Sequence, residues 1–306
     1  MSESNCRYPR NNLAACMLPW TEDFTLDEPA FVRHVQSAID GRYKCIYLMG
    51  TAGEGYALSN ATFEHVVEVF AGLTVKDGLD PQIGVISLSM QQILERLALC
   101  YDKGIRMFQL PLPSWGALDD DELLLFFTTV CGAFPDCRFL HYNLPRAKRI
   151  LTGADYRRIA DAVPNLVATK NSTSDRGRTT DLMTNAGDLQ HFFLEGSYAM
   201  GAYMGECSLL CSMDTVFPKL TWDFFEAGVR KDMNELFRIT QFLHHFCERM
   251  FEHCKREMID GSYDKLFIWL RDPEFHYRML PPYIGLSDDE SRVCREVFER
   301  EFAQVQ

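Results

Sequence analysis

The sequence predicts an α/β fold: a closed (β/α)8 barrel, or TIM barrel, with a C-terminal helical extension. Short apolar runs alternate eight times with longer helical segments over about 210 residues, and the last part of the chain has no strand-like run. The continuously apolar strands indicate a parallel sheet that is covered on both faces. Eight units suit a closed barrel better than an open doubly wound sheet, and no Gly-x-Gly-x-x-Gly follows the first strand. We expect residues 1–213 to form the barrel with the catalytic site, and residues 214–306 to form an extension packed on it.

The predicted strands are apolar, β-branched or aromatic runs of about five residues, each followed by Gly, Pro, Asn or Ser. In chain order they are Leu13–Leu18, Cys45–Met49, Gln82–Ile86, Met107–Leu110, Arg138–Tyr142, Leu166–Lys170, His191–Glu195 and Cys207–Ser212.

The predicted helices lie between these strands, and several begin at an Asp, Asn or Thr that can cap them. Gly41, Gly78 and Gly104 stand where helices should end. The helices are Asp27–Asp40, Asn60–Lys76, Met90–Lys103, Asp119–Ala133, Gly153–Val163, Asp175–Ala186 and a short one at Tyr198–Met204.

From Asp214 onward only helices are predicted, in about 90 residues. This extension either packs beside the barrel, builds an oligomer contact, or does both. Its helices are Trp222–Gly228, Lys231–Arg256, Ser262–Arg271 and Asp288–Phe302.

The composition excludes several classes of protein. The chain has 306 residues with 31 Lys and Arg against 43 Asp and Glu, a net charge of −12. Without a basic run, the sequence lacks the positive surface that binding to nucleic acid or an anionic membrane requires. An anionic substrate therefore needs a locally positive site, made by backbone N–H groups or a few basic side chains.

The N-terminal stretch, the absence of long apolar stretches and the cysteines indicate a cytoplasmic protein. Met1–Arg10 is polar and lacks the apolar part of a signal peptide, and no stretch approaches 18 apolar residues. The 11 cysteines are scattered, with no Cys-x-x-Cys; Cys207 and Cys211 are the closest pair. We predict buried thiols rather than disulfides, and no metal site.

Barrel enzymes place their chemistry at the carboxyl ends of the strands. Lys170 ends an apolar strand at this position. A protonated lysine is not a nucleophile, but desolvation in a barrel mouth favours the free amine, which can attack a ketone and form a Schiff base. The alternative is a structural lysine at the barrel rim. Tyr142 ends the preceding strand and could relay a proton, or could be a core or rim tyrosine.

The loop after the second strand has a geometry suited to anions. Two glycines, Gly50 and Gly53, surround Thr51 and Ala52, so backbone N–H groups can turn toward a carboxylate, and the Thr51 hydroxyl can bind that carboxylate or a tyrosine. A tight turn without a ligand is the alternative.

Gly50-Thr51-Ala52-Gly53-Glu54, then Tyr142-Asn143-Leu144-Pro145, then Lys170 resemble the dihydrodipicolinate synthase/N-acetylneuraminate lyase family over about residues 10 to 300. The resemblance implies that Lys170 forms a Schiff base with pyruvate or another 2-oxo acid, that Tyr142 shuttles protons, and that the glycine loop holds the α-carboxylate. It implies no cofactor, because the iminium is the electron sink, and a homo-oligomer, a dimer or a tetramer.

Four departures from the family pattern bear on the reaction. Ala52 replaces a hydroxyl residue, the stretch Leu110–Trp115 lacks the synthases' relay tyrosine, Ala147 stands where synthases have an arginine, and the acidic pair of sialic acid lyases is missing after Gly196. The two best-known activities are therefore disfavoured, and whether Trp115 or another residue replaces the relay tyrosine stays open.

The sequence predicts a lyase for aldol-type carbon–carbon cleavage or condensation. The alternatives are a 2-keto-3-deoxy sugar acid dehydratase that uses the same iminium, and a 2-oxo acid-binding homologue with weakened catalysis. Candidate contacts to the substrate are Gly50, Thr51, Ala52, Gly53, Arg146, Ser172, Gly196 and Ser197.

Overall fold

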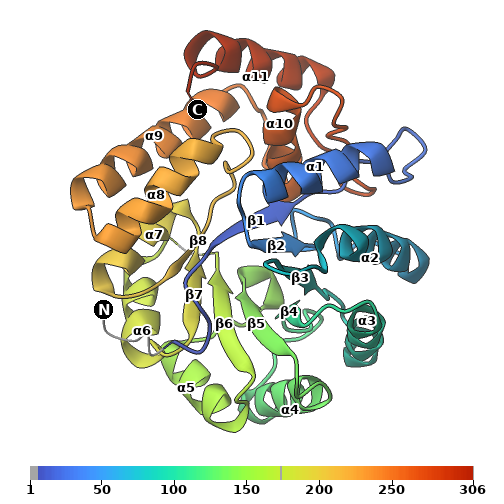
Figure 1. Ribbon diagram of the computed structural model, residues 1–306, viewed down its shortest axis with the longest axis vertical. Coiled ribbons are helices and arrows are strands. Elements are labelled where there is room, and N and C mark those ends of the chain that lie inside the picture. Colours follow the sequence, from blue (N-terminus) through green and yellow to red (C-terminus); the bar gives the residue numbers. More distant parts are fainter. Residues whose placement is uncertain (1–5, 173, 306) are drawn as a thin grey trace.

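The computed structural model describes residues 6–172 and 174–305, and these residues form eight parallel strands that close into a barrel in sequence order. The predicted (β/α)8 fold is confirmed. Figure 1 shows the strands at the centre of a ring of helices. The strands are β1 (Asn12–Cys16), β2 (Cys45–Leu48), β3 (Asp80–Gly84), β4 (Met107–Leu110), β5 (Arg138–Asn143), β6 (Leu166–Asn171), β7 (Gln190–Phe193) and β8 (Ser208–Leu210).

Each strand is followed by a helix that packs on the outside of the barrel, and polar caps begin most of these helices. Asp119, for example, accepts from the backbone N–H of Glu122, whose side chain accepts in return. The ring consists of α1 (Glu28–Asp40), α2 (Asn60–Thr74), α3 (Met90–Asp102), α4 (Asp120–Gly132), α5 (Gly153–Ala162), α6 (Arg176–Asn185), α7 (Glu195–Met204) and α8 (Pro218–Arg230).

The boundaries of several strands and helices differ from the prediction, as three examples show. β3 begins at Asp80 because the Asp80 N–H donates to the Lys44 carbonyl at 2.7 Å, which continues the ladder to β2. β8 ends at Leu210, where the chain enters a turn closed by the Asp214 N–H on the Cys211 carbonyl. α7 begins at Glu195, which the sequence assigned to the end of the seventh strand.

Helix α8 lies next to α7, and the Trp222 indole N–H donates to the Gly41 carbonyl after α1 at 2.9 Å, so α8 joins the last and first units of the barrel. Three further helices of the described residues lie outside this ring, at the upper left and the top of Figure 1. They are α9 (Met233–Phe251), α10 (Asp260–Arg271) and α11 (Asp288–Glu301).

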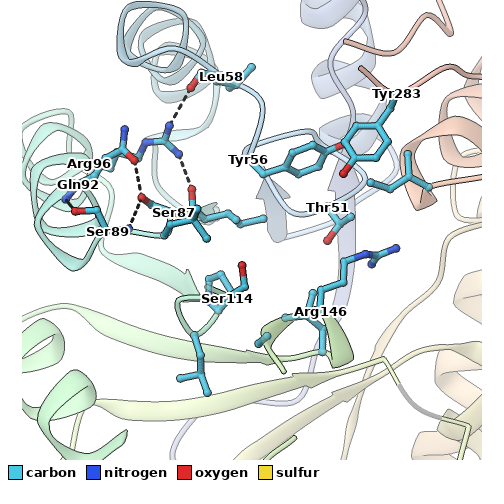
Figure 2. A pocket seen from close by; sticks show the side chains of 17 residues that line it. Thr51, Tyr56, Leu58, Ser87, Ser89, Gln92, Arg96, Ser114, Arg146 and Tyr283 are labelled. Atoms are coloured by element: carbon cyan, nitrogen blue, oxygen red, sulfur yellow. Dashed lines mark hydrogen bonds between the residues drawn. The ribbon is translucent and has the colours of Figure 1, made fainter. Parts of the chain in front are cut away.

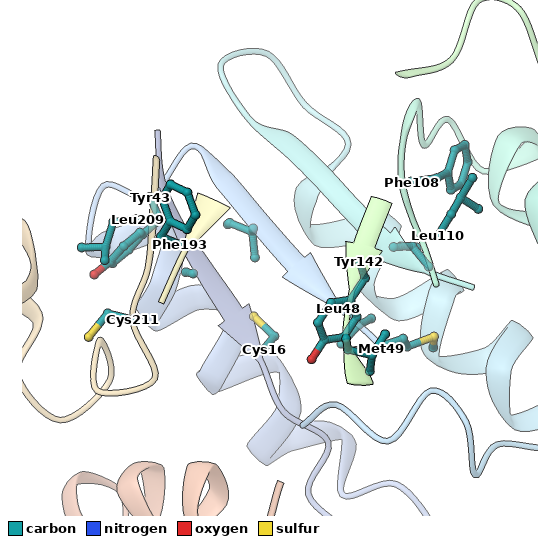
Figure 3. Packing of buried hydrophobic residues seen from close by; sticks show 14 of the residues in the cluster. Cys16, Tyr43, Leu48, Met49, Phe108, Leu110, Tyr142, Phe193, Leu209 and Cys211 are labelled. Carbon is teal, nitrogen blue, oxygen red and sulfur yellow. The ribbon is translucent and has the colours of Figure 1, made fainter. Parts of the chain in front are cut away.

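The apolar core has two layers. One cluster fills the barrel interior and includes Leu13, Tyr47 and Phe192. The larger cluster lies mostly between strands and helices, and Figure 3 shows part of it, including Leu48 from β2 and Phe193 from β7. Cys16, Cys45 and Cys211 are buried free thiols. Among the described residues, no helix has the length and apolar character needed to cross a membrane.

Candidate active site

Lys170 lies inside the barrel mouth, near the carboxyl end of β6. Only 7% of its surface is exposed. Its neighbour in the register of β5 is Tyr142, and the Lys170 Nζ lies 4.0 Å from the centroid of the Tyr142 ring and 5.2 Å from that of Tyr47. Two phenol rings therefore surround an amine that forms no ion pair within the described part of the chain.

A cavity of about 480 Å³ opens above Lys170. It brings together most of the residues predicted from the sequence. Those that line it are Gly50, Ala52, Gly53, Tyr142, Arg146, Lys170 and Ser172.

Thr51 lines a second cavity of about 560 Å³ beside the first, together with Tyr56, Ser87, Ser114 and other residues (Figure 2). Its hydroxyl still donates to the Tyr142 hydroxyl at 3.5 Å, and the Ser172 hydroxyl lies at the same distance from Tyr142. Arg146 lines both cavities, whereas Thr51 lines only the second one. Thr51 can therefore position Tyr142, while Thr51 itself lines the second cavity.

Gly196 and Ser197 do not lie where the sequence placed them. The N–H groups of Ser197 and Tyr198 both donate to the Leu194 carbonyl at 3.0 Å, so these residues form the first turn of α7. Ser197 is buried in the helix. The cavity wall at the end of β7 is made by Leu194 and Glu195 instead.

The glycine loop lines the cavity and is closed by its own backbone hydrogen bonds. The N–H of Glu54 donates to the Thr51 carbonyl and that of Gly55 to the Gly50 carbonyl, which closes the turn. In the described residues no acceptor takes the N–H of Ala52 or Gly53, so both are free for a carboxylate. Gly50 is required sterically, because a Cβ there would overlap the Tyr47 hydroxyl.

The last residue of the loop motif, Glu54, is fully buried and holds the loop to the extension. It accepts from the Trp20 indole N–H at 2.7 Å and from the Leu280 N–H at 2.7 Å, and it pairs with Lys265 of α10. Burial lowers the pKa of Lys265 to about 8. Glu54 therefore fixes the position of the loop and does not face the substrate cavity.

Arg146 is half-exposed and its guanidinium binds Asp260 through two parallel hydrogen bonds of 3.1 and 3.0 Å. Asp260 is the first residue of α10. The arginine that the sequence offered for substrate binding thus links the loop after β5 to the extension, with its charge balanced by a carboxylate.

Besides Asp260, three carboxyl residues that line the cavity were absent from the predicted site: Glu195 at the start of α7, Asp214 in the turn after β8, and Asp264 of α10. Desolvation raises the pKa of all three, to about 8 for Asp214. Glu195 and Asp214 come after the ends of strands, where site residues of a barrel are expected, so their positions in the sequence could have identified them as candidates. Asp264 belongs to an ordinary amphipathic helix in the sequence, where nothing distinguishes it from a surface residue.

Within the described residues, no group of three His, Cys, Asp or Glu side chains has an arrangement that could hold a metal ion. The chemistry available from the site is that of an amine, two phenols, backbone N–H groups and carboxyls. A buried amine beside hydroxyls and free N–H groups is suited to carbonyl chemistry on an anionic substrate.

The chain is similar to known proteins in sequence and in fold. A model of the dihydrodipicolinate synthetase family matches residues 9–266. The chain is 26% identical over 232 residues to a protein of Saccharopolyspora erythraea named "Probable 5-dehydro-4-deoxyglucarate dehydratase", covering 74% of each chain. It is 27% identical over 260 residues to an N-acetylneuraminate lyase of Pongo abelii, covering 77% of this chain and 78% of the relative.

The structure of YagE, a prophage protein of the dihydrodipicolinic acid synthase family from E. coli K12, matches 95% of this chain and 98% of its own with a TM-score of 0.86. At 14% identity this likeness supports the fold alone.

The closed barrel and the family match define an enzyme of the class I aldolase and lyase type. The chain belongs to the dihydrodipicolinate synthetase family, which includes synthases, N-acetylneuraminate lyases and a dehydratase.

Proposed function

We propose that the chain is a lyase that forms a Schiff base between Lys170 and pyruvate or a related 2-oxo acid. The observation that carries the proposal is the buried, unpaired Lys170 amine, 4.0 Å from the centre of the Tyr142 ring and in the same cavity as the Gly50–Gly53 loop. YagE, in the same family, is described in complex with pyruvate.

In the proposed reaction, the α-carboxylate binds the N–H groups of Ala52 and Gly53. The free amine of Lys170 attacks the keto carbon, and the resulting carbinolamine loses water to give an iminium. Tyr142 carries the protons of these steps, since its hydroxyl lies within 3.5 Å of Thr51 and Ser172.

Cleavage follows from the same iminium. The C4 hydroxyl loses its proton, the C3–C4 bond breaks, and its electron pair moves into an enamine while the distal part leaves as an aldehyde. A proton adds to C3, and water hydrolyses the iminium to return the 2-oxo acid and Lys170. Condensation is the reverse sequence.

Dehydration is the second candidate, because one relative is named as a dehydratase. There the iminium loses a C3 proton to give the enamine, and the C4 hydroxyl then leaves as water. The organic product distinguishes the two reactions: cleavage gives two carbonyl fragments, whereas dehydration keeps the carbon chain intact. A homologue that binds 2-oxo acids with weakened catalysis would give an adduct without either product.

The test is reduction of the intermediate. We expect pyruvate with cyanoborohydride to add one reduced adduct, mapped by mass spectrometry to Lys170, and expect Lys170→Arg to give none. Arg keeps the charge but is not a nucleophile. Lys231→Arg is the matched control, because Lys231 is an exposed residue that follows the last turn of α8, and this variant should be labelled at Lys170 like the wild type. An absence of adduct with several 2-oxo acids would exclude the mechanism.

The Tyr142→Phe variant tests the proton relay. We expect adduct formation to slow by about 100-fold, because the loss of one general acid–base group has roughly that effect. The long 3.5 Å contacts of its hydroxyl predict little change in melting temperature. Tyr203→Phe is the control, since Tyr203 is exposed on α7. Wild-type rates in Tyr142→Phe would show that another group carries the proton.

We further propose that the enzyme acts on free small molecules in the cytoplasm as a homo-oligomer. The exposed apolar side chains of Leu88, Trp115 and Ile284 support an oligomer contact, with Trp115 83% exposed. Light scattering of the purified chain measures the state directly, and a monomer at micromolar concentration would contradict the proposal.

A further inference from the structure

Among the described residues that line the cavity above Lys170, only Tyr47 buries a side-chain polar atom that forms no hydrogen bond. Tyr47 comes from β2, is 2% exposed, and belongs to the cluster that fills the barrel interior. The Lys170 Nζ lies 5.2 Å from the centroid of its ring. A buried hydroxyl without a partner is rare in native proteins, and in a substrate cavity a bound ligand can supply that partner.

Two glycines leave room for the Tyr47 hydroxyl. A Cβ on Gly50 would overlap its oxygen, and a Cβ on Gly84 would lie only 3.0 Å from it. Met49, two residues after Tyr47, has a φ of 64°, in the left-handed region that residues other than glycine rarely adopt. The hydroxyl therefore lies directly against Gly50, the first residue of the loop that receives the carboxylate in the proposed function.

The glycine loop itself supplies no hydroxyl to this cavity. Ala52 has none, and Thr51 lines the second cavity. The donors that residues 50–53 offer to a carboxylate are thus the backbone N–H groups of Ala52 and Gly53. In a Schiff base the carboxylate carbon is two bonds from the lysine nitrogen, so its partners must lie near both the loop and Lys170. Tyr47 meets both conditions.

The Tyr47 hydroxyl is suited to a carboxylate because it stays protonated. Burial raises the pKa of this hydroxyl well above the usual value for a phenol. A neutral O–H group donates one hydrogen bond, and a bond of this kind to an ionised oxygen is roughly twice as strong as one between neutral groups. A carboxylate would therefore satisfy the buried hydroxyl and gain a strong donor.

We propose that Tyr47 is a substrate-binding residue whose hydroxyl donates to the α-carboxylate of the 2-oxo acid, in place of the hydroxyl that Ala52 lacks. The inference rests on the proposed Schiff base at Lys170, because that bond brings the carboxylate to this part of the cavity. Recognition of the substrate then uses a side chain of the barrel interior as well as the glycine loop.

The Tyr47→Phe variant removes only the hydroxyl. The measurement is the rate of reduced adduct formation on Lys170, with cyanoborohydride, over a range of pyruvate concentrations. We expect the half-saturating concentration to rise at least about tenfold, while the rate at saturation stays within about threefold of the wild type. The melting temperature should stay the same or rise by up to about 4 °C, because a buried hydroxyl without a partner destabilises the free protein.

Pyruvamide tests whether the carboxylate is the group that Tyr47 binds. It keeps the keto carbon and nearly the size of pyruvate but carries no charge. We expect Tyr47→Phe to change the half-saturating concentration of pyruvamide by less than about threefold, because the bond that the variant loses is then not charge-assisted.

Tyr8 of the same interior cluster provides the matched control, because its hydroxyl has partners. It donates to Asp80 at 2.5 Å and lies 3.1 Å from the Cys45 Sγ, at the end of the barrel opposite Lys170. We expect Tyr8→Phe to lower the melting temperature and to keep the wild-type half-saturating concentration of pyruvate.

The outcomes separate the two proposals. If pyruvate gives no adduct with the wild type, the proposed function is wrong, and the role of Tyr47 with it. If pyruvate reacts but Tyr47→Phe keeps the wild-type half-saturating concentration, or lowers the melting temperature as Tyr8→Phe does, the Schiff base stands and the role of Tyr47 is wrong. Equal effects on pyruvate and pyruvamide would exclude the carboxylate as its ligand. A slower rate at saturation alone would instead make Tyr47 a proton donor in the chemistry.

Discussion

The Glu54–Lys265 pair is the most consequential buried contact outside the reacting groups. Both side chains are completely buried, and they join the glycine loop to α10. Lys265 also donates to the Arg278 carbonyl at 2.7 Å, and Trp20 donates to Glu54. A buried pair is costly to desolvate but much more costly to break on one side, because the remaining charge then has no partner.

We predict that Lys265→Met lowers the free energy of unfolding by about 3–5 kcal/mol. The double variant Glu54→Gln/Lys265→Met should be less destabilised than the single one, since it leaves no unpaired buried charge. Urea denaturation measures both. Arg292→Ala, which breaks the exposed pair with Glu296, is the matched control and should cost less than about 1 kcal/mol. If Lys265→Met and Arg292→Ala lowered the free energy of unfolding by the same amount, the stabilising role of the buried pair would be contradicted.

At the scale of elements, α10 is the part of the extension that reaches the cavity. Asp260, Tyr263 and Asp264 of this helix all line it. The helix can approach because Gly261 lies against the glycine loop: a Cβ there would come within 2.6 Å of the Ala52 carbonyl oxygen. The extension thus completes the site that the barrel begins.

We predict that Gly261→Ala moves α10 away from the loop. Alanine in a helix normally stabilises by up to about 1 kcal/mol relative to glycine, so a loss of stability here would report the steric contact. Pyruvate should then need a higher concentration for half-maximal adduct, because the loop that holds its carboxylate shifts. Gly132→Ala in α4 is the control, since nothing lies within 4 Å of its Cβ position, and it should not destabilise. A stabilised Gly261→Ala would refute the steric role.

At the scale of the whole molecule, buried titratable groups give the stability an unusual dependence on pH. Burial lowers the pKa of His34, His141 and His191 to about 4, 3 and 4. These histidines take up protons on unfolding below about pH 6.5, which reduces stability as the pH falls. Burial raises the pKa of Asp214 to about 8, and that of Asp264 and Glu195 also rises. These acids release protons on unfolding, which reduces stability as the pH rises.

The buried acids and the buried histidines have opposite effects on stability between about pH 4.5 and 6.5. In this range both kinds of group are protonated to a different extent in the folded and the unfolded protein. Above about pH 6.5 the histidines are neutral in both states and the buried acids dominate. Lys265, whose pKa burial lowers to about 8, takes up a proton on unfolding and partly opposes the acids as the pH approaches 8. We predict that the free energy of unfolding changes little from pH 4.5 to 6.5 and falls from pH 6.5 to 8, by at most about 1.4 kcal/mol per pH unit for each acid.

In the Asp214→Asn variant, the free energy of unfolding should fall less steeply above pH 6.5. Between pH 4.5 and 6.5 it should rise with pH, because the effect of the histidines is then opposed by fewer buried acids. Chemical denaturation at each pH measures the change, and Asp289→Asn on α11 is the control. A wild-type stability that increases from pH 6.5 to 8 would show that Asp214 is ionised in the folded protein.

The order of strands and helices and the position of Lys170 could be predicted from the sequence, because both depend on local patterns. Apolar runs separated by amphipathic segments specify strands and helices, and a polar residue at a strand end must lie at the barrel mouth. Gly196 and Ser197 were misplaced because the strand pattern did not reveal that Leu194 caps a helix beginning at Glu195.

By itself the sequence determined the closed barrel and the helical extension. It also determined that Lys170, Tyr142 and the Gly50–Gly53 loop lie at one end of the barrel. Both follow from local features of the chain, namely short-range periodicity and the residues at strand ends. Only the tertiary structure decided that Thr51 faces the second cavity, that Glu54 serves as an anchor, and that Asp264 reaches the site. These three placements depend on how α10 packs against the glycine loop. Contacts between residues about 210 positions apart, such as Glu54 and Lys265, leave no local pattern in the sequence.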